Sequence, residues 1–166
     1  MRLGVLITLL AFATPSFAEP IAISIPQEKL TVHFDARPLK KIAENYKDGR
    51  YSYVGNAGTF NLSLFVEPSK CPGDESNDVR YKCFLEILRT VPLVQMSTVR
   101  GHERPAGVVV FYMMLVGSSQ VLHANLLFRH GGKAGDLHAS VAAPKPDDVK
   151  FLFALMESVQ LRKSGE

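Results

Sequence analysis

The sequence predicts an α+β domain, in which an antiparallel β-sheet is layered with two or three α-helices. Several short segments alternate apolar and polar residues with the two-residue period of half-buried strands. Turn-forming residues separate most of these segments by only a few positions, which favours hairpins. Other stretches space their apolar residues three and four apart, as amphipathic helices do. Strands joined mainly by hairpins predict an antiparallel sheet rather than a doubly wound parallel one.

Residues 1–18 have the organisation of a secretory signal peptide. A short positive start precedes an uncharged apolar run over 3–13, which is too short to span a bilayer. Ser16 and Ala18 supply the small residues that signal peptidase needs, so we expect cleavage before Glu19. Because no cysteine stands at this point, we expect no lipid anchor. The sequence therefore predicts a periplasmic or secreted protein without a membrane anchor after cleavage.

Length and composition favour a single globular domain over residues 19–166. The chain has 166 residues, of which 46% are hydrophobic and 21% charged, and this composition excludes intrinsic disorder. Its 19 basic and 16 acidic side chains produce no field strong enough to predict a nucleic-acid partner. Tryptophan is absent from the sequence, and no cofactor is predicted.

Two strands and a helix are expected at the start of the domain. Alternation over 21–25 and 30–34 predicts short strands on either side of Pro26. From Pro38 the apolar positions follow a helical spacing, and Gly49 is placed to end the helix. These positions are Leu39, Ile42, Ala43 and Tyr46.

A hairpin and a second helix follow. Residues 51–54 and 60–66 flank Gly55-Asn56-Ala57-Gly58, a turn whose glycines can adopt positive φ. The second helix is expected over about 78–90, because Pro92 prevents its continuation. Its apolar face consists of Phe84, Ile87, Leu88 and Val91.

Three strands are expected in the second half of the chain. Residues 107–116 are almost wholly apolar and predict a central strand that is covered on both faces. Gly117-Ser118-Ser119 turns the chain into a strand over 121–128, and Gly131-Gly132 turns it again into a strand over 136–141.

Two more segments complete the prediction. A final helix is expected after Pro144 and Pro146, docked on the sheet through an apolar face. That face consists of Val149, Leu152, Phe153, Met156 and Val159. The polar segment before Pro105 is expected to be a solvated loop, with Arg100, His102, Glu103 and Arg104.

The two cysteines, Cys71 and Cys83, are expected to pair. Thiols in an exported protein normally form disulfides, and this bond would attach a loop to the second helix. The spacing is too wide for a redox-active C-x-x-C motif. Two cysteines are also too few for a four-cysteine zinc site.

Three segments of the chain carry a resemblance to known proteins: Gly55–Glu67 (GNAGTFNLSLFVE), Cys71 together with Tyr81–Phe84 (YKCF), and Asp136–Ser140 (DLHAS). They resemble a group of small exported bacterial proteins of uncharacterised function. The strand and helix order of that group is similar to the PsbP-like α/β/α sandwich. The resemblance covers most of the chain after residue 18 and implies that sandwich. It implies no catalytic residues, because the group has none assigned.

The hairpin around Gly131-Gly132 carries the candidate functional residues. If these glycines form the turn, His138 lies opposite Asn125 and Ser140 lies opposite His123. One face of the hairpin is then apolar, with Leu122, Ala124, Leu126, Phe128, Leu137, Ala139 and Val141. The other face gathers His123, Asn125, Asp136, His138 and Ser140.

These five polar residues have three interpretations. They could form a nucleophilic group, with His138 as base, Asp136 or Asn125 as orienter and Ser140 as nucleophile. However, a serine two positions along the strand is about 7 Å from its histidine, and the G-x-S-x-G motif is absent.

A metal site is the second interpretation, with His123, His138 and Asp136 as ligands for zinc or copper. The sequence has neither H-x-x-x-H nor H-x-H spacing here, so no metal site is predicted. The third interpretation is a polar sheet face, either wet or lining a shallow ligand groove. It accounts for all five residues as ligand-binding candidates without catalysis.

The sequence therefore favours an exported non-enzymatic binding or accessory protein with an unknown protein or small ligand as its partner. One alternative is an inhibitor or immunity protein that blocks an exported toxin or enzyme by inserting a loop such as Pro68–Asp78. The other alternative is a hydrolase-like enzyme that uses His138.

Overall fold

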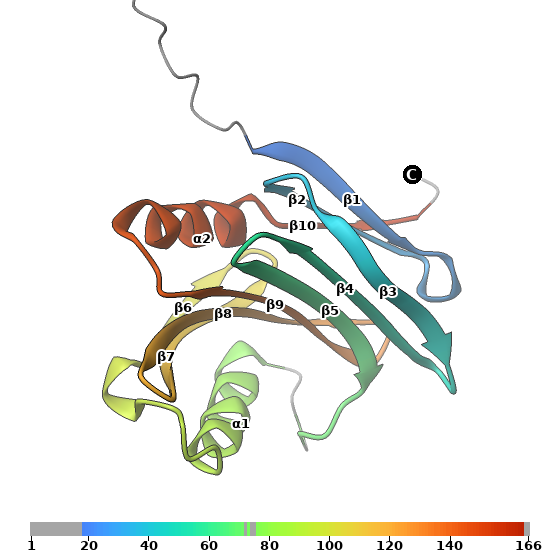
Figure 1. The fold of residues 1–166 in the computed structure, drawn as a ribbon. Coiled ribbons are helices and arrows are strands. Elements are labelled where there is room, and N and C mark those ends of the chain that lie inside the picture. The colour runs from blue at the N-terminus through green and yellow to red at the C-terminus, as the bar shows by residue number, and fades with distance from the viewer. Residues whose placement is uncertain (1–17, 72, 74–75, 165–166) are drawn as a thin grey trace, which may run out of the picture.

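A seven-stranded antiparallel sheet forms the middle layer of the computed structural model, which describes residues 18–71, 73 and 76–164 (Figure 1). The predicted signal peptide falls almost entirely outside these residues. In sheet order, the strands are β3 (Lys40–Lys47), β4 (Arg50–Ala57), β5 (Phe60–Pro68), β9 (Lys133–Ala142), β8 (Ser119–His130), β7 (Gly107–Val116) and β6 (Arg100–Arg104).

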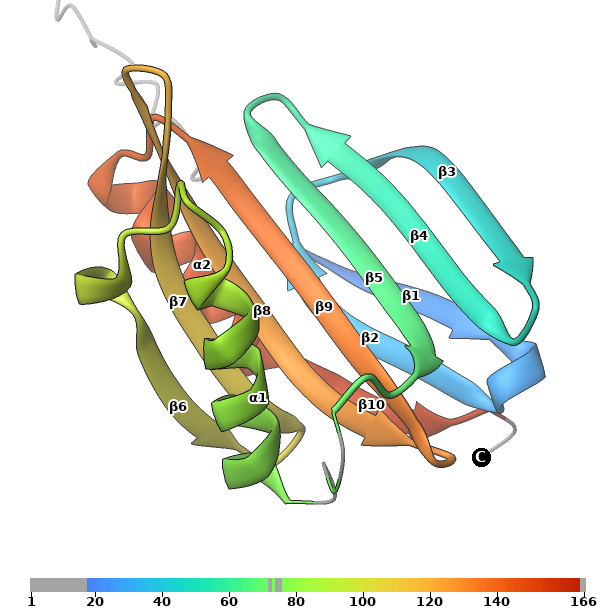
Figure 2. The same ribbon diagram turned by 90° about the horizontal axis from the view of Figure 1, so that it is seen from below.

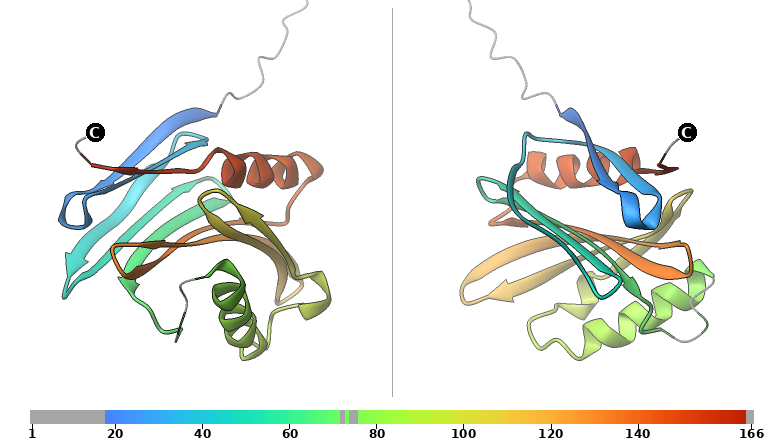
Figure 3. Two further views of the ribbon diagram at one scale, coloured as in Figure 1. Left: turned by 180° about the vertical axis from the view of Figure 1, so that it is seen from behind. Right: turned by 90° about the vertical axis from the view of Figure 1, so that its right-hand side faces the viewer.

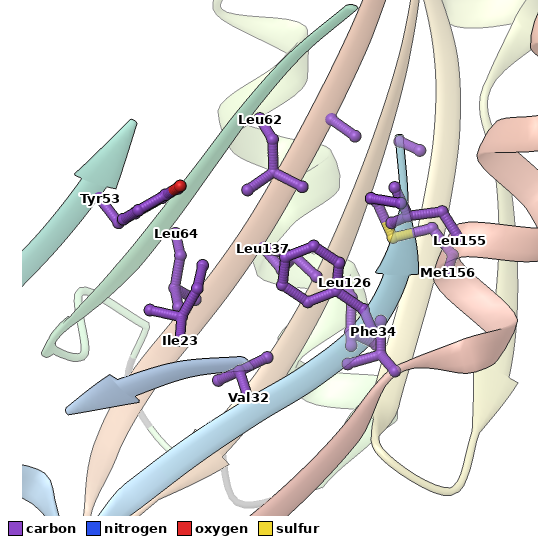
Figure 4. Packing of buried hydrophobic residues seen from close by; sticks show 14 of the residues in the cluster. Ile23, Val32, Phe34, Tyr53, Leu62, Leu64, Leu126, Leu137, Leu155 and Met156 are labelled. Atoms are coloured by element: carbon purple, nitrogen blue, oxygen red, sulfur yellow. The ribbon is translucent and has the colours of Figure 1, made fainter. Parts of the chain in front are cut away.

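One face of this sheet is covered by a small second sheet and a helix. The second sheet contains β1 (Glu19–Ile25), β2 (Leu30–Ala36) and β10 (Gln160–Lys163), and a 3-10 turn, η1 (Pro26–Glu28), joins its first two strands. Helix α2 (Pro146–Ser158) lies beside it on the same side (Figure 3). The main hydrophobic core fills the space between these layers, where Phe34, Leu126 and Leu137 are buried (Figure 4).

Helix α1 (Asn77–Arg89) covers part of the opposite face. Seen from below, it lies across β7 and β8, whereas the same face of β5 and β4 carries no helix (Figure 2). The Ser76 hydroxyl accepts a hydrogen bond from the backbone N–H of Val79 and so caps the start of α1. Leu88 of α1 packs with Val108, Val110, Tyr112 and Leu127 in a second, smaller core. The sheet is therefore buried on both faces near β7 and β8.

The predicted α+β class with an antiparallel sheet is confirmed, and so are the helices near 78–90 and after Pro146. The helix predicted from Pro38 is wrong, because this segment forms strand β3. A β-bulge between Lys41 and Ala43 inserts an extra residue, so Ile42 falls out of the two-residue alternation. Without a regular alternation, the apolar spacing imitates a helix.

Two other predictions for local structure need correction. The polar segment that begins at Arg100 is not a loop, because β6 pairs with β7 along 107–111. Its side chains are mostly exposed, and a polar outer strand has no sequence pattern that separates it from a loop. The 51–66 hairpin turns at Gly58-Thr59, since β4 continues to Ala57, opposite Phe60. The short β10 was not predicted.

The two outer strands of the large sheet carry exposed charged side chains. On β3 these are Lys40, Lys41, Glu44 and Lys47, and on β6 they are Arg100 and Glu103. Among the residues that the structure describes, no helix has the length and apolarity needed to cross a membrane.

Candidate functional site

The β8–β9 hairpin has the register that the sequence predicts. Asn125 lies opposite His138, and His123 lies opposite Ser140. All five candidate residues therefore lie on the sheet face that α1 partly covers. Leu137 on the other face is fully buried, at 0% exposure. The two-sided alternation along the hairpin is confirmed.

This polar face is largely buried rather than wet. Asn125 and Ser140 are 3% and 7% exposed, and the side chains around them are half-buried. The cause is the position of β8 and β9 near the centre of the sheet, beside the small core under α1. We name the five residues together with Ser63 the polar band.

A row of rings crosses the polar band from strand to strand. Tyr112 on β7 stacks on His123 with ring centroids 5.0 Å apart, and His123 stacks on His138 at 5.1 Å. His123 Nδ1 and His138 Nε2 share a hydrogen bond of 2.8 Å. His138 Nδ1 is 3.4 Å from the hydroxyl of Ser63 on β5. The sequence did not indicate Ser63, because only the register of β5 against β9 places it opposite His138.

Both histidines are held in the neutral form. Burial lowers the pKa of His123 to about 4, since a charged imidazole would lose its hydration there. Burial and the neighbouring His123 lower the pKa of His138 to about 4 as well. The Nε2 atom of His123 is buried and has no hydrogen-bond partner among the described residues.

Asp136 lies beside this row and differs from it in charge. The side-chain amide of Asn125 donates from Nδ2 to both carboxyl oxygens of Asp136, at 2.8 and 3.0 Å. Burial raises the pKa of Asp136 to about 6, although the Asn125 hydrogen bonds act in the opposite direction. Glu67 contributes a smaller rise in that pKa, as a nearby like charge. Asp136 is therefore ionised at neutral pH at a cost in free energy.

A pocket of about 220 Å³ opens beside Asp136, between α1 and the sheet. Its wall is mainly apolar, and its charged lining groups are Glu67, Lys70, Arg80 and Asp136. The apolar lining side chains are Phe65, Pro68, Phe84, Ile87, Leu127 and Ala134. Pockets of this kind, apolar with a few polar groups, are the usual sites of small ligands in proteins.

The predicted disulfide between Cys71 and Cys83 is confirmed, with the two Cα atoms 5.9 Å apart. Cys71 belongs to the segment after β5, and Cys83 to α1. Cys71 itself lines the pocket. The bond therefore links two parts of the pocket lining, the segment after β5 and helix α1.

Of the five predicted residues, only Asp136 lines the pocket. Sequence reasoning missed the helix side of the site, which Arg80, Phe84 and Ile87 supply at intervals of about one helical turn. The sequence did contain a signal for the helix side of the site. Arg80 falls one turn before Phe84 on the apolar side of α1, and it is 7% exposed. An arginine on a buried helix face marks a polar contact inside the structure.

The arrangement offers little to a nucleophilic mechanism. Ser140 makes no hydrogen bond to either histidine in the described part of the chain. Ser63 approaches His138, but β5 pairs with β4 on one side and with β9 on the other. The backbone N–H groups of β5 are therefore used in the sheet, whereas an oxyanion hole requires N–H groups that are free to bind the substrate.

The polar band also differs from a three-ligand metal centre. His123 and His138 are hydrogen-bonded to each other, and Asp136 is turned to Asn125. Within residues 18–71, 73 and 76–164, no three His, Cys, Asp or Glu side chains are grouped so that they could hold a metal ion.

Comparison with protein-family models finds no match to the chain, and comparison with curated proteins finds none either.

Proposed function

We propose that the protein is an exported, non-enzymatic binding or accessory protein, and that its ligand occupies the pocket between α1 and the sheet. One observation carries this proposal: the carboxylate of Asp136 lies at an apolar pocket and is ionised there at a cost in stability. Groups that are kept in an unfavourable state commonly serve a site rather than the fold. The ligand is a small molecule or a side chain of a partner protein.

The proposed export rests on the signal-peptide pattern of residues 1–18 and is supported by the disulfide, a bond typical of oxidising compartments. We also propose that the fold is of the PsbP-like α/β/α type, as the resemblance implies. The helices on both faces of the large sheet support this assignment.

The experiment is a fragment screen followed by backbone amide chemical shifts in NMR spectra. Ala134→Leu places a larger side chain on the pocket floor, because Ala134 lines the pocket on the same face of β9 as Asp136. Ala142→Leu is the matched control, since Ala142 is exposed at the other end of the same strand face.

We expect some fragments to shift the amide signals of Phe84, Ile87 and Asp136 in the wild type and in Ala142→Leu. We expect no such shift in Ala134→Leu. If no fragment shifts these signals, or if the shifts persist in Ala134→Leu, the proposed function is wrong.

A further inference from the structure

We propose that the pocket selects an organic ammonium group on an apolar ring or stem, with the ammonium on Asp136 and the apolar part between α1 and the sheet. This inference rests on the proposed function and specifies the ligand's chemistry.

The first step is the inventory of charges around the pocket. Glu67 forms an ion pair with Lys70 at 3.0 Å and a longer one with Arg50 at 3.9 Å. The Arg80 guanidinium donates to Asn77 Oδ1 at 2.9 Å and to a backbone carbonyl oxygen at 3.4 Å. Both of these lining groups are therefore engaged within the protein.

Asp136 differs from Glu67, the other acidic group of the pocket lining. Its hydrogen bonds come from the neutral amide of Asn125, and it forms no ion pair with any residue that the structure describes. A carboxylate in an apolar setting is strongly stabilised by a cation at contact distance. A positive charge would therefore complete this site, and an anion would meet repulsion from Asp136.

The second step is the shape and chemistry of the remaining wall. Phe65 and Phe84 provide aromatic rings, which attract ammonium groups as well as apolar carbon. Ile87 and Leu127 provide aliphatic surface. The volume of about 220 Å³ exceeds the roughly 150 Å³ of an apolar cavity that binds benzene. One ring with a short chain that ends in an ammonium group fits these dimensions.

The test uses three probes of nearly equal size and different charge: 2-phenylethylamine, 2-phenylethanol and phenylacetate. Dissociation constants are measured at pH 7.5 by NMR titration with the wild type, with Asp136→Asn and with Glu67→Gln. We expect the amine to bind at least about tenfold more tightly than the alcohol. This preference should disappear in Asp136→Asn and persist in Glu67→Gln.

A pH series provides a second measurement. The other titratable or charged groups around Asp136 are Glu67 on β5, Lys70 after it, Arg80 on α1 and His138 two residues along β9. Because protonation of Asp136 removes the charge that holds the amine, we expect affinity to weaken about tenfold between pH 7 and pH 5. Affinity for the alcohol should change little over the same range.

The source of the ammonium group is distinguished by a fourth probe, Nα-acetyl-lysine methylamide. If it binds more tightly than 2-phenylethylamine and depends equally on Asp136, the ligand is a lysine of a partner protein. The inference is overturned if the alcohol or phenylacetate binds as tightly as the amine, or if the preference survives in Asp136→Asn. It is also overturned if none of the four probes binds. The proposed binding function survives each of these results as long as other fragments occupy the pocket, and fails only when none does.

Discussion

Leu137 and His138 are neighbours in sequence on opposite faces of β9, and truncating each one tests the sheet register directly. Leu137 is 0% exposed and lies between its strand partners Leu64 and Leu126 in the main core. Replacing a buried leucine by alanine removes its transfer free energy and leaves a cavity, which costs about 2–5 kcal/mol. For His138→Ala we expect a smaller loss of about 1–2 kcal/mol, because one buried nitrogen of His123 loses its partner.

The assay is urea denaturation followed by circular dichroism. With a slope of about 2 kcal/mol per molar urea, Leu137→Ala should lower the midpoint by about 1–2.5 M, and His138→Ala by less than about 1 M. Ser140→Ala is the matched control on the polar face, and we expect it to change stability by less than about 0.5 kcal/mol. If His138→Ala costs more than Leu137→Ala, the assignment of the two faces is refuted.

Three further predictions concern the disulfide, a cross-strand contact and the pocket carboxylate. Cys83→Ala should lower the free energy of unfolding by about 2–4 kcal/mol. Thiol titration of the native wild type should find no free thiol, and two reactive thiols would contradict the Cys71–Cys83 bond. Gly135→Ala should cost about 1–3 kcal/mol, because a Cβ there would lie 2.1 Å from the ring of buried Phe128; an unchanged melting temperature would contradict this packing. Asp136→Asn should raise the melting temperature at pH 7, because the folded state raises the pKa of this carboxyl to about 6 and disfavours its ionised form. The gain should shrink as the pH falls from 6 toward 4, where Asp136 is protonated in the wild type, and a gain that is independent of pH would contradict the raised pKa.

The parts of the fold that could be predicted from sequence depend on short-range patterns. The Gly131-Gly132 turn and the alternation on both sides of it determine the pairing of β8 with β9, because a shift by one residue would move Leu137 out of the main core and place polar groups there. The helix prediction for the β3 segment is wrong because it depended on the same kind of short-range pattern. Its bulge at Ile42 breaks the alternation on which the prediction depends.

The candidate site was predicted only in part, because it is assembled from segments distant in the chain. Asp136 could be selected from its place in the hairpin. The approach of α1 with Arg80 and Phe84 depends on how the helix packs, and no local pattern specifies this. The contact between Ser63 and His138 likewise requires the pairing of β5 with β9.

The charged outer strands of the large sheet affect how copies of the protein meet one another. An exposed strand edge is a template on which another chain can add, and this is a common start of aggregation. Two copies that approach through β3 would bring Lys40, Lys41 and Lys47 close to their counterparts. The bulge also bends this edge away from the flat geometry that strand addition needs. Both features of β3 therefore disfavour edge-to-edge growth of the large sheet through this strand.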